Sequence, residues 1–155
     1  MTIVAFRLSK TIRLSSAFTG DGARTYGGRW NSPGTKVVYA SSTLSLATLE
    51  IMVHLESYKT LCEDYSFVNV EMPSEIIETV DPTTLRPGWD SGAPGPESQQ
   101  IGDSWASKLE SAVLSVPTVL VPGEVNYLLN PDHPDFRRIA ISKPKRICFD
   151  RRLVK

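Results

Sequence analysis

Short strand-like segments dominate this sequence, and only two segments have the length and periodicity of a helix. The strand-like segments are rich in β-branched and aromatic residues, and glycine, proline and polar residues separate them. They do not alternate regularly with helices, which favours an α+β fold with a mostly antiparallel, partly split sheet. Strands are predicted at 3–8, 36–40, 65–72, 76–80, 112–122, 137–143 and 146–150, and helices at 44–56 and 98–111.

The sequence shows no point at which the chain divides into separate units. It has 155 residues, the size of one ordinary domain, and neither an internal repeat nor a linker-like stretch. We therefore expect one domain over residues 1–155. The Pro- and Gly-rich segment 81–97 is predicted to be a long ordered loop or lid. Segment 123–136 is rich in turn-forming residues, and Pro117 places its strand near a sheet edge or a bulge.

The first predicted helix is unusually apolar. The hydroxyl residues at 41–43 supply an N-cap before it. Its apolar positions form one stripe and fill most of the remaining surface, so we expect a helix buried on most sides. These positions are Leu44, Leu46, Ala47, Leu49, Ile51, Val53 and Leu55; in the second helix the stripe is Ile101, Trp105 and Leu109.

Several classes of protein are disfavoured. The apolar run at the N-terminus is too short for a signal peptide, and no run of about 18 apolar residues occurs, so we expect a cytoplasmic protein that does not enter a membrane. Cys62 and Cys148 form no CxxC pair, and His54 and His133 have no matching ligands, so no metal site is expected. GxSxG is absent, which disfavours a serine hydrolase, and the basic C-terminus lacks the interleaved aromatic residues of a nucleic-acid-binding surface.

The formal net charge of zero conceals a strong asymmetry along the chain. Residues 1–49 carry six Lys/Arg and one acidic residue, residues 50–135 carry three and fifteen, and residues 136–155 carry eight and one. Both ends are therefore basic and the middle is acidic. If the ends lie together as neighbouring strands, they present a positive surface to an anionic ligand, while the acidic middle meets a basic partner. Solvated surface charge is the alternative explanation.

Three polar residues of special interest lie within residues 27–50. Glu50 lies in the apolar helix, where an ionised carboxylate is costly unless it is used in function or paired with His54 or an arginine. Arg29 follows two glycines; its guanidinium either grips a phosphate or carboxylate or stays in water. Tyr39 ends a short strand, and its ring either packs in the core or stacks on a heteroaromatic ligand.

Taken together with the motifs around them, these residues resemble the RES-domain family, the toxin half of bacterial toxin–antitoxin pairs. The resemblance rests on FRL, GGRWNSPGTKVVYAS, LATLEIMVHLE, IGDSWASK, AVLSVPT and NYLLNPDHPDF, which follow the family's order along most of the chain. It places the family's arginine, tyrosine and glutamate at Arg29, Tyr39 and Glu50. The family's serine is replaced, because the motif that resembles VPS reads VPT here. Thr118 keeps the hydroxyl but adds a methyl group and restricts χ1.

The resemblance implies a fold like that of ADP-ribosyltransferases, with NAD+ as a substrate in a cleft between sheet segments and no prosthetic group. It implies that Glu50 stabilises the positive charge that develops on the ribose when the bond to nicotinamide breaks. Arg29 would orient a phosphate or ribose of NAD+, and Tyr39 would position the nicotinamide ring. Thr118 would hydrogen-bond the substrate.

The resemblance leaves the acceptor open and implies a partner. Water, inorganic phosphate or a protein side chain would receive the ADP-ribosyl group, so the protein depletes NAD+ or modifies a protein target. An Xre-type helix-turn-helix antitoxin would neutralise the toxin by covering the cleft or restricting its opening. The alternative is a non-catalytic protein that binds nucleotide or antitoxin, which the replacement at Thr118 favours.

Overall fold

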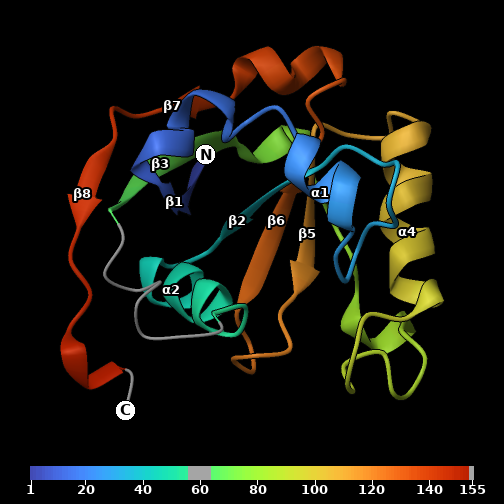
Figure 1. Ribbon diagram of the computed structural model, residues 1–155. Helices are drawn as coiled ribbons and strands as arrows, with labels where there is room; N and C mark the ends of the chain where they lie inside the picture. Colours follow the sequence, from blue (N-terminus) through green and yellow to red (C-terminus); the bar gives the residue numbers. More distant parts are fainter. Residues whose placement is uncertain (56–63, 154–155) are drawn as a thin grey trace.

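The computed structural model describes residues 1–55 and 64–153 (Figure 1). The strands are β1 Thr2–Lys10, β2 Val38–Ser41, β3 Tyr65–Pro73, β4 Ile77–Thr79, β5 Val113–Pro117, β6 Val125–Leu129, β7 Ala140–Ile141 and β8 Lys145–Ile147. The α-helices are α1 Asp21–Tyr26, α2 Leu44–Met52 and α4 Pro96–Ser107. Short 3-10 turns span Thr11–Ser16, Ser74–Ile76, Pro82–Thr84, Pro134–Arg138 and Arg151–Leu153. Cys62 and the predicted helix end at Glu56 lie outside the described residues.

The described strands form one curled sheet in the order β4-β5-β6-β2-β1-β3-β7, with β8 also paired to β3. Neighbouring strands run antiparallel except for β4 and β5, which are parallel. The predicted α+β class and the mostly antiparallel sheet are therefore confirmed. The basic N- and C-terminal strands, however, do not pair with each other as the charge argument supposed, because β3 lies between β1 and both C-terminal strands.

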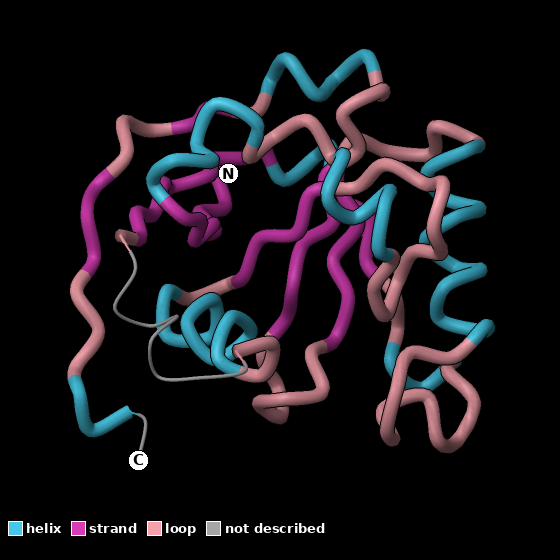
Figure 2. Tube along the Cα trace, in the orientation of Figure 1, coloured by secondary structure: helices cyan, strands magenta, loops and turns pink. Residues whose placement is uncertain are grey.

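The sheet opens between β1 and β2. Within the described chain, these two strands share a single register pair, Phe6 with Ser41, whereas β1 pairs with β3 from end to end. Figures 1 and 2 show the consequence: β1 and β3 turn away from the group formed by β2, β6 and β5. One sheet thus has two halves joined at a narrow seam, which is the form that the predicted split takes.

Two apolar clusters lie on opposite faces of β5 and β6, and the larger one holds the two halves of the sheet together. It joins β1 and β3 to β2, β5 and β6 through Ala5, Val38, Ala40, Val68, Val70, Met72, Val113 and Leu129. The second packs α4 and the chain before β2 against the other side of β5 and β6, with Trp30, Val37, Trp105, Leu114, Val116 and Leu128. Since adjacent residues of a strand face opposite ways, Val113 and Leu114 enter different clusters. Strand β5 is therefore buried on both faces.

Helix α2 begins as predicted but is shorter and more exposed. The Thr43 hydroxyl accepts a hydrogen bond from the Leu46 amide, which makes Thr43 the N-cap. The helix ends at Met52 rather than at residue 56. It packs on one side against β1 and β2, where Leu46 and Ala47 are buried, whereas Leu49 is 38% exposed. The prediction of a helix buried on most sides is wrong, because in the described part of the chain α2 packs against the sheet on one side only.

The other differences have local physical causes. Segment 123–136, predicted as turns, contains β6, a strand in the middle of the sheet. Pro117 is the last residue of β5, and β4 pairs with β5 only as far as Ser115, so within the described chain Pro117 has a neighbouring strand on the β6 side alone, in keeping with a place near the sheet edge. Leu109 falls after the end of α4, with φ of 52° and 44% exposure, so it does not extend the apolar stripe. No helix among residues 1–55 and 64–153 is long and apolar enough to cross a membrane.

Helix α4 touches the segment before β2 so closely that Gly102 accepts no side chain. A Cβ atom at Gly102 would lie 1.7 Å from the carbonyl oxygen of Trp30, a backbone atom that cannot rotate away. We expect Gly102→Ala to lower the free energy of unfolding by about 3 kcal/mol, measured by urea titration. Gly22→Ala is the matched control, because Gly22 is also helical and a Cβ atom there meets nothing within 4 Å. Equal stability of the two variants would contradict this packing.

Candidate active site

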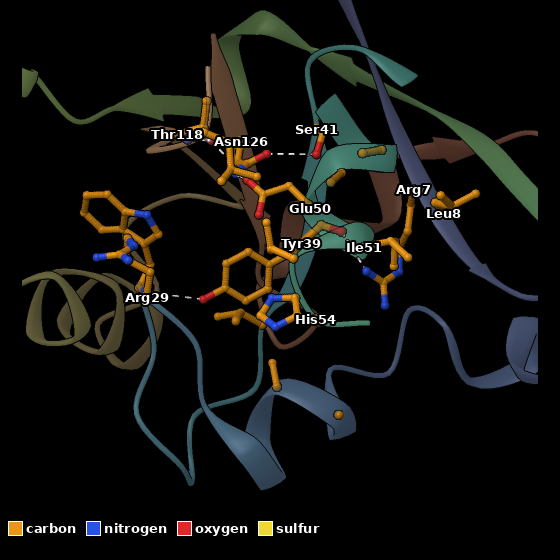
Figure 3. Close-up of a pocket in the computed structure, with 18 of the residues that line it drawn as sticks. Arg7, Leu8, Arg29, Tyr39, Ser41, Glu50, Ile51, His54, Thr118 and Asn126 are labelled. Atoms are coloured by element: carbon orange, nitrogen blue, oxygen red, sulfur yellow. Dashed lines mark hydrogen bonds between the residues drawn. The ribbon is translucent and has the colours of Figure 1, made fainter. Parts of the chain in front are cut away.

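The opening of the sheet forms a cleft of about 700 Å³. Its walls come from β1, β2, α2 and the chain after β5, together with the segments that precede β2 and α4. Figure 3 shows the two cleft arginines on opposite sides of Tyr39 and Glu50. The four residues that the sequence singled out all line this cleft: Arg29, Tyr39, Glu50 and Thr118.

The carboxylate of Glu50 is held by two polar neighbours. Its Oε1 atom accepts hydrogen bonds from Thr118 Oγ1 at 3.0 Å and from Asn126 Nδ2 at 2.7 Å. Glu50 forms no ion pair within the described part of the protein, so the structural Glu–His or Glu–Arg pair considered from the sequence is not found there. His54 also lines the cleft but is exposed and makes no hydrogen bond to Glu50. A carboxylate held by neutral donors keeps its negative charge available to a cationic centre.

The hydroxyl of Thr118 is already used within the protein. It donates to Glu50 and accepts a hydrogen bond from the Leu120 amide at 3.2 Å. Because a hydroxyl has one proton to donate, Thr118 supports Glu50 in this structure rather than presenting a donor to a ligand. The threonine at this position thus keeps a hydroxyl that is hydrogen-bonded to the carboxylate.

Arg29 lies at the tip of a tight turn and contacts the Pro- and Gly-rich segment 81–97. The turn is closed by the Gly28 amide, which donates to the Asn31 carbonyl at 2.8 Å. The Arg29 guanidinium donates to the carbonyl oxygens of Trp89 and Gly92, both at 2.8 Å. Its charge is not neutralised by any carboxylate among the described residues. Arg29 therefore fixes one wall of the cleft and still brings a positive charge to it.

Helix α4 supports the Arg29 turn from behind. Ser98 Oγ donates to the Arg29 carbonyl at 2.5 Å, and Gln99 Nε2 donates to the Gly28 carbonyl at 3.0 Å. One turn further along, Asp103 accepts hydrogen bonds from the amide and hydroxyl of Ser32. The sequence IGDSWASK and the residues just before it thus hold the backbone that carries Arg29.

Tyr39 uses its hydroxyl to brace the same turn. The hydroxyl donates to Asn31 Oδ1 at 2.7 Å and accepts a hydrogen bond from the Trp30 amide at 3.3 Å. A Cβ atom at Gly28 would lie 2.8 Å from this oxygen, so glycine is required there by contact with Tyr39. Burial raises the pKa of Tyr39 far above its ordinary range, and the phenol stays neutral. The ring is partly buried and borders the cleft.

Arg7 is a cleft residue that the sequence analysis missed. Its Nε donates to the Ala17 carbonyl and its Nη1 to the Tyr39 carbonyl, both at 2.7 Å. Desolvation lowers the pKa of Arg7 to about 10, so the side chain is still cationic at neutral pH. It forms no ion pair with a described carboxylate. A charged residue inside an otherwise apolar strand, within the FRL motif, was the available signal.

The charged residues that line the cleft indicate the charge of the ligand that it can bind. Arg7, Arg29 and Glu50 are the described lining residues with a formal charge, which leaves one net positive charge. The described residues contain no group of three or more His, Cys, Asp or Glu side chains that could hold a metal ion. An anionic ligand whose reacting centre becomes positive fits both signs of charge.

Comparison with known proteins identifies the family. The RES domain matches residues 4–150 of this chain. "Prs ADP-ribosylating toxin" from Sphingobium sp. (strain YBL2) is 38% identical over 160 residues, covering 100% of this chain and 99% of the relative. "Toxin Res" from Photorhabdus laumondii is 36% identical over 155 residues, covering 99% of this chain and 98% of the relative. The chain therefore belongs to the RES-domain family.

The fold is also similar to a solved structure. A chain in the crystal structure of the M. tuberculosis MbcT–MbcA toxin–antitoxin complex superposes with a TM-score of 0.72. The similarity covers 96% of this chain and 85% of the other, at 17% sequence identity. At this level of identity, the comparison supports the arrangement of the sheet and helices.

We expect Tyr39→Phe to lower the free energy of unfolding at pH 8 by about 1–3 kcal/mol, because the Trp30 amide and Asn31 lose a buried partner. An unfolded tyrosine ionises near pH 10, whereas the folded pKa of Tyr39 is raised, so folding stability is lost as the pH rises above about 10. Urea unfolding between pH 8 and 11 should show the wild type losing about 1.4 kcal/mol per pH unit more than the variant above pH 10. If the stability of the wild type and of the variant fell in parallel with pH, that result would contradict a raised pKa of Tyr39 in the folded protein.

Proposed function

We propose that this RES-domain protein is the toxin of a bacterial toxin–antitoxin pair and that it cleaves the nicotinamide–ribose bond of NAD+. The observation that carries the proposal is Glu50, a carboxylate held by neutral donors in a cleft that also contains Arg7 and Arg29, neither of which forms an ion pair with a described carboxylate. Breaking the bond between C1′ and nicotinamide builds positive charge on the ribose, which a fixed carboxylate stabilises. The pyrophosphate of NAD+ supplies the negative charge that guanidinium groups bind well.

The other cleft residues have roles that follow from their places. Arg29 orients a phosphate or ribose of NAD+ with the N–H groups that its carbonyl partners leave available, since a guanidinium has five. Arg7 adds a second positive charge on the other side of Tyr39 and Glu50 (Figure 3). The Tyr39 ring offers a flat face to the nicotinamide, while its hydroxyl is committed to the Arg29 turn. The volume of the cleft, about 700 Å³, is in the range that accommodates a ligand of this size.

Transfer of ADP-ribose to a protein is the second candidate activity. It is favoured by the name of the Sphingobium relative, an ADP-ribosylating toxin that is similar to this chain along its whole length. Hydrolysis or phosphorolysis uses the same bond cleavage with water or inorganic phosphate as acceptor. The candidates therefore share the role of Glu50 and differ in what attacks C1′.

An antitoxin partner is part of the proposal. The solved structure with the same fold comes from a toxin–antitoxin complex, which supports a protein partner for this chain. We propose an Xre-type helix-turn-helix antitoxin that covers the cleft or restricts its opening, as the family resemblance implies. The segment 50–135, which is rich in acidic residues, is a candidate binding surface for the antitoxin. Binding through such charges should weaken as salt is added.

Purified protein should consume NAD+, and Glu50→Gln should reduce the rate at least about a hundredfold, because the amide is neutral and cannot stabilise the ribose cation. NAD+ is measured over time by chromatography, and circular dichroism confirms that the variant is folded. Glu71→Gln is the matched control, since Glu71 is an exposed glutamate on β3 and should keep wild-type turnover. Full turnover by folded Glu50→Gln would reject the role of the carboxylate.

The products of the reaction should identify which acceptor receives the ADP-ribosyl group. With phosphate-free buffer, a rate that rises on adding inorganic phosphate indicates phosphorolysis, and release of free ADP-ribose at an unchanged rate indicates hydrolysis. With labelled NAD+ and a cell extract, transfer of label to a polypeptide indicates protein ADP-ribosylation. Unchanged NAD+ and unlabelled protein, despite measurable nucleotide binding, would instead support a non-catalytic binding protein.

A further inference from the structure

Asn126 lies in the middle of the sheet, within hydrogen-bond distance of Glu50. It belongs to β6 and pairs across the sheet with Ser41 of β2 on one side and Val116 of β5 on the other. Its side chain reaches the cleft, where Figure 3 shows it beside Thr118 and Glu50. An amide side chain at this place costs more than an apolar one unless both of its polar ends have partners.

Both polar ends of the Asn126 amide have hydrogen-bond partners, and the chemistry of these partners fixes which end faces Glu50. Nδ2 donates to Glu50 Oε1 at 2.7 Å, and Oδ1 accepts from Ser41 Oγ at 2.8 Å. An ionised carboxylate has no proton to donate, so the amide nitrogen must be the end that faces Glu50. Ser41 then keeps the amide in this orientation by donating to its oxygen. The three side chains form a chain of hydrogen bonds from β2 through β6 to α2.

The hydrogen bonds distinguish the two oxygens of Glu50. Oε1 receives the donors of both Asn126 and Thr118. Oε2 receives no hydrogen bond from any residue in the described ranges, 1–55 and 64–153. One oxygen is thus anchored to the sheet, and the other is left for a ligand in the cleft.

We propose that Asn126 is a positioning residue that fixes the rotation of the Glu50 carboxylate and thereby selects Oε2 as the oxygen that meets the ribose. This role rests on the proposed NAD+-cleaving function. Asn126 acts through Glu50 and has no contact with the reacting bond, so its loss reduces the rate of cleavage rather than substrate binding. The pairing of β6 with β2 and β5 is made by backbone groups and does not require this side chain.

The test uses Asn126→Asp and Asn126→Leu in the full-length chain, with kcat and KM for NAD+ measured separately. Asn126→Asp keeps the volume and the acceptor for Ser41 but replaces the donor to Glu50 with a second carboxylate; Asn126→Leu removes the polar group. Both variants should lose about tenfold to a hundredfold in kcat with KM changed less than about twofold. Asn69→Asp on β3 is the matched control and should keep wild-type kinetics.

A reversed pair tests the contact independently of activity. In Glu50→Gln combined with Asn126→Asp, the amide and the carboxylate exchange places, so the hydrogen bond is restored with its direction reversed. Thermal unfolding should show this double variant to be more stable than Asn126→Asp alone, while it does not cleave NAD+. If the change in stability of the double variant equals the sum of the changes in the two single variants, the direct contact between residues 50 and 126 is rejected.

The kinetic outcomes separate this inference from the function on which it rests. A wild type that leaves NAD+ intact rejects the proposed function, and the positioning role with it. An active wild type with unchanged kcat in folded Asn126→Leu and Asn126→Asp rejects the positioning role alone. A large rise in KM at unchanged kcat also overturns it, because that result assigns Asn126 to substrate binding.

Discussion

The architecture of the site depends on the place where β1 and β2 part. Most neighbouring strands in this sheet pair along several residues, but these two meet at Phe6 and Ser41 and then diverge. Arg7 spans the gap, and its guanidinium satisfies the Tyr39 carbonyl that no backbone donor of β1 reaches. A partly buried cation thus replaces part of a β-ladder, which opens the sheet without leaving that oxygen unpaired.

The wall of the cleft that carries Arg29 is held by contacts with α4, and the wall that carries Glu50 is held by contacts with the sheet. The Arg29 turn is held by the buried side chain of Trp30, which packs in the second apolar cluster, and by hydrogen bonds from α4 and Tyr39 to its backbone. Glu50, in contrast, reaches across from α2 to residues of β6 and the chain after β5. Two elements that are independent in sequence therefore set the distance between the positive and negative groups of the site.

The charged groups of the cleft are hydrogen-bonded to neutral partners and not to one another. Arg7 and Arg29 donate to backbone carbonyls rather than to carboxylates, and Glu50 accepts from neutral donors rather than from a cation. If the two arginines and Glu50 formed ion pairs with one another, their electric fields would largely cancel, and the cleft would attract a charged ligand only weakly. Kept apart by neutral partners, each retains the charge that an anionic ligand with a cationic reacting centre requires.

The α+β class, a hydroxyl N-cap within residues 41–43 and the family could be predicted from the sequence, as could the candidate residues Arg29, Tyr39, Glu50 and Thr118, because these depend on local patterns and short motifs. The sequence did not reveal β6, whose VNYLL lies among turn-forming residues, nor Arg7 and Asn126 as partners of the site. Nor did it show that Leu49 and Val53 face outward. These features depend on which strands become neighbours and on where the sheet opens, and so they are visible in the folded chain alone.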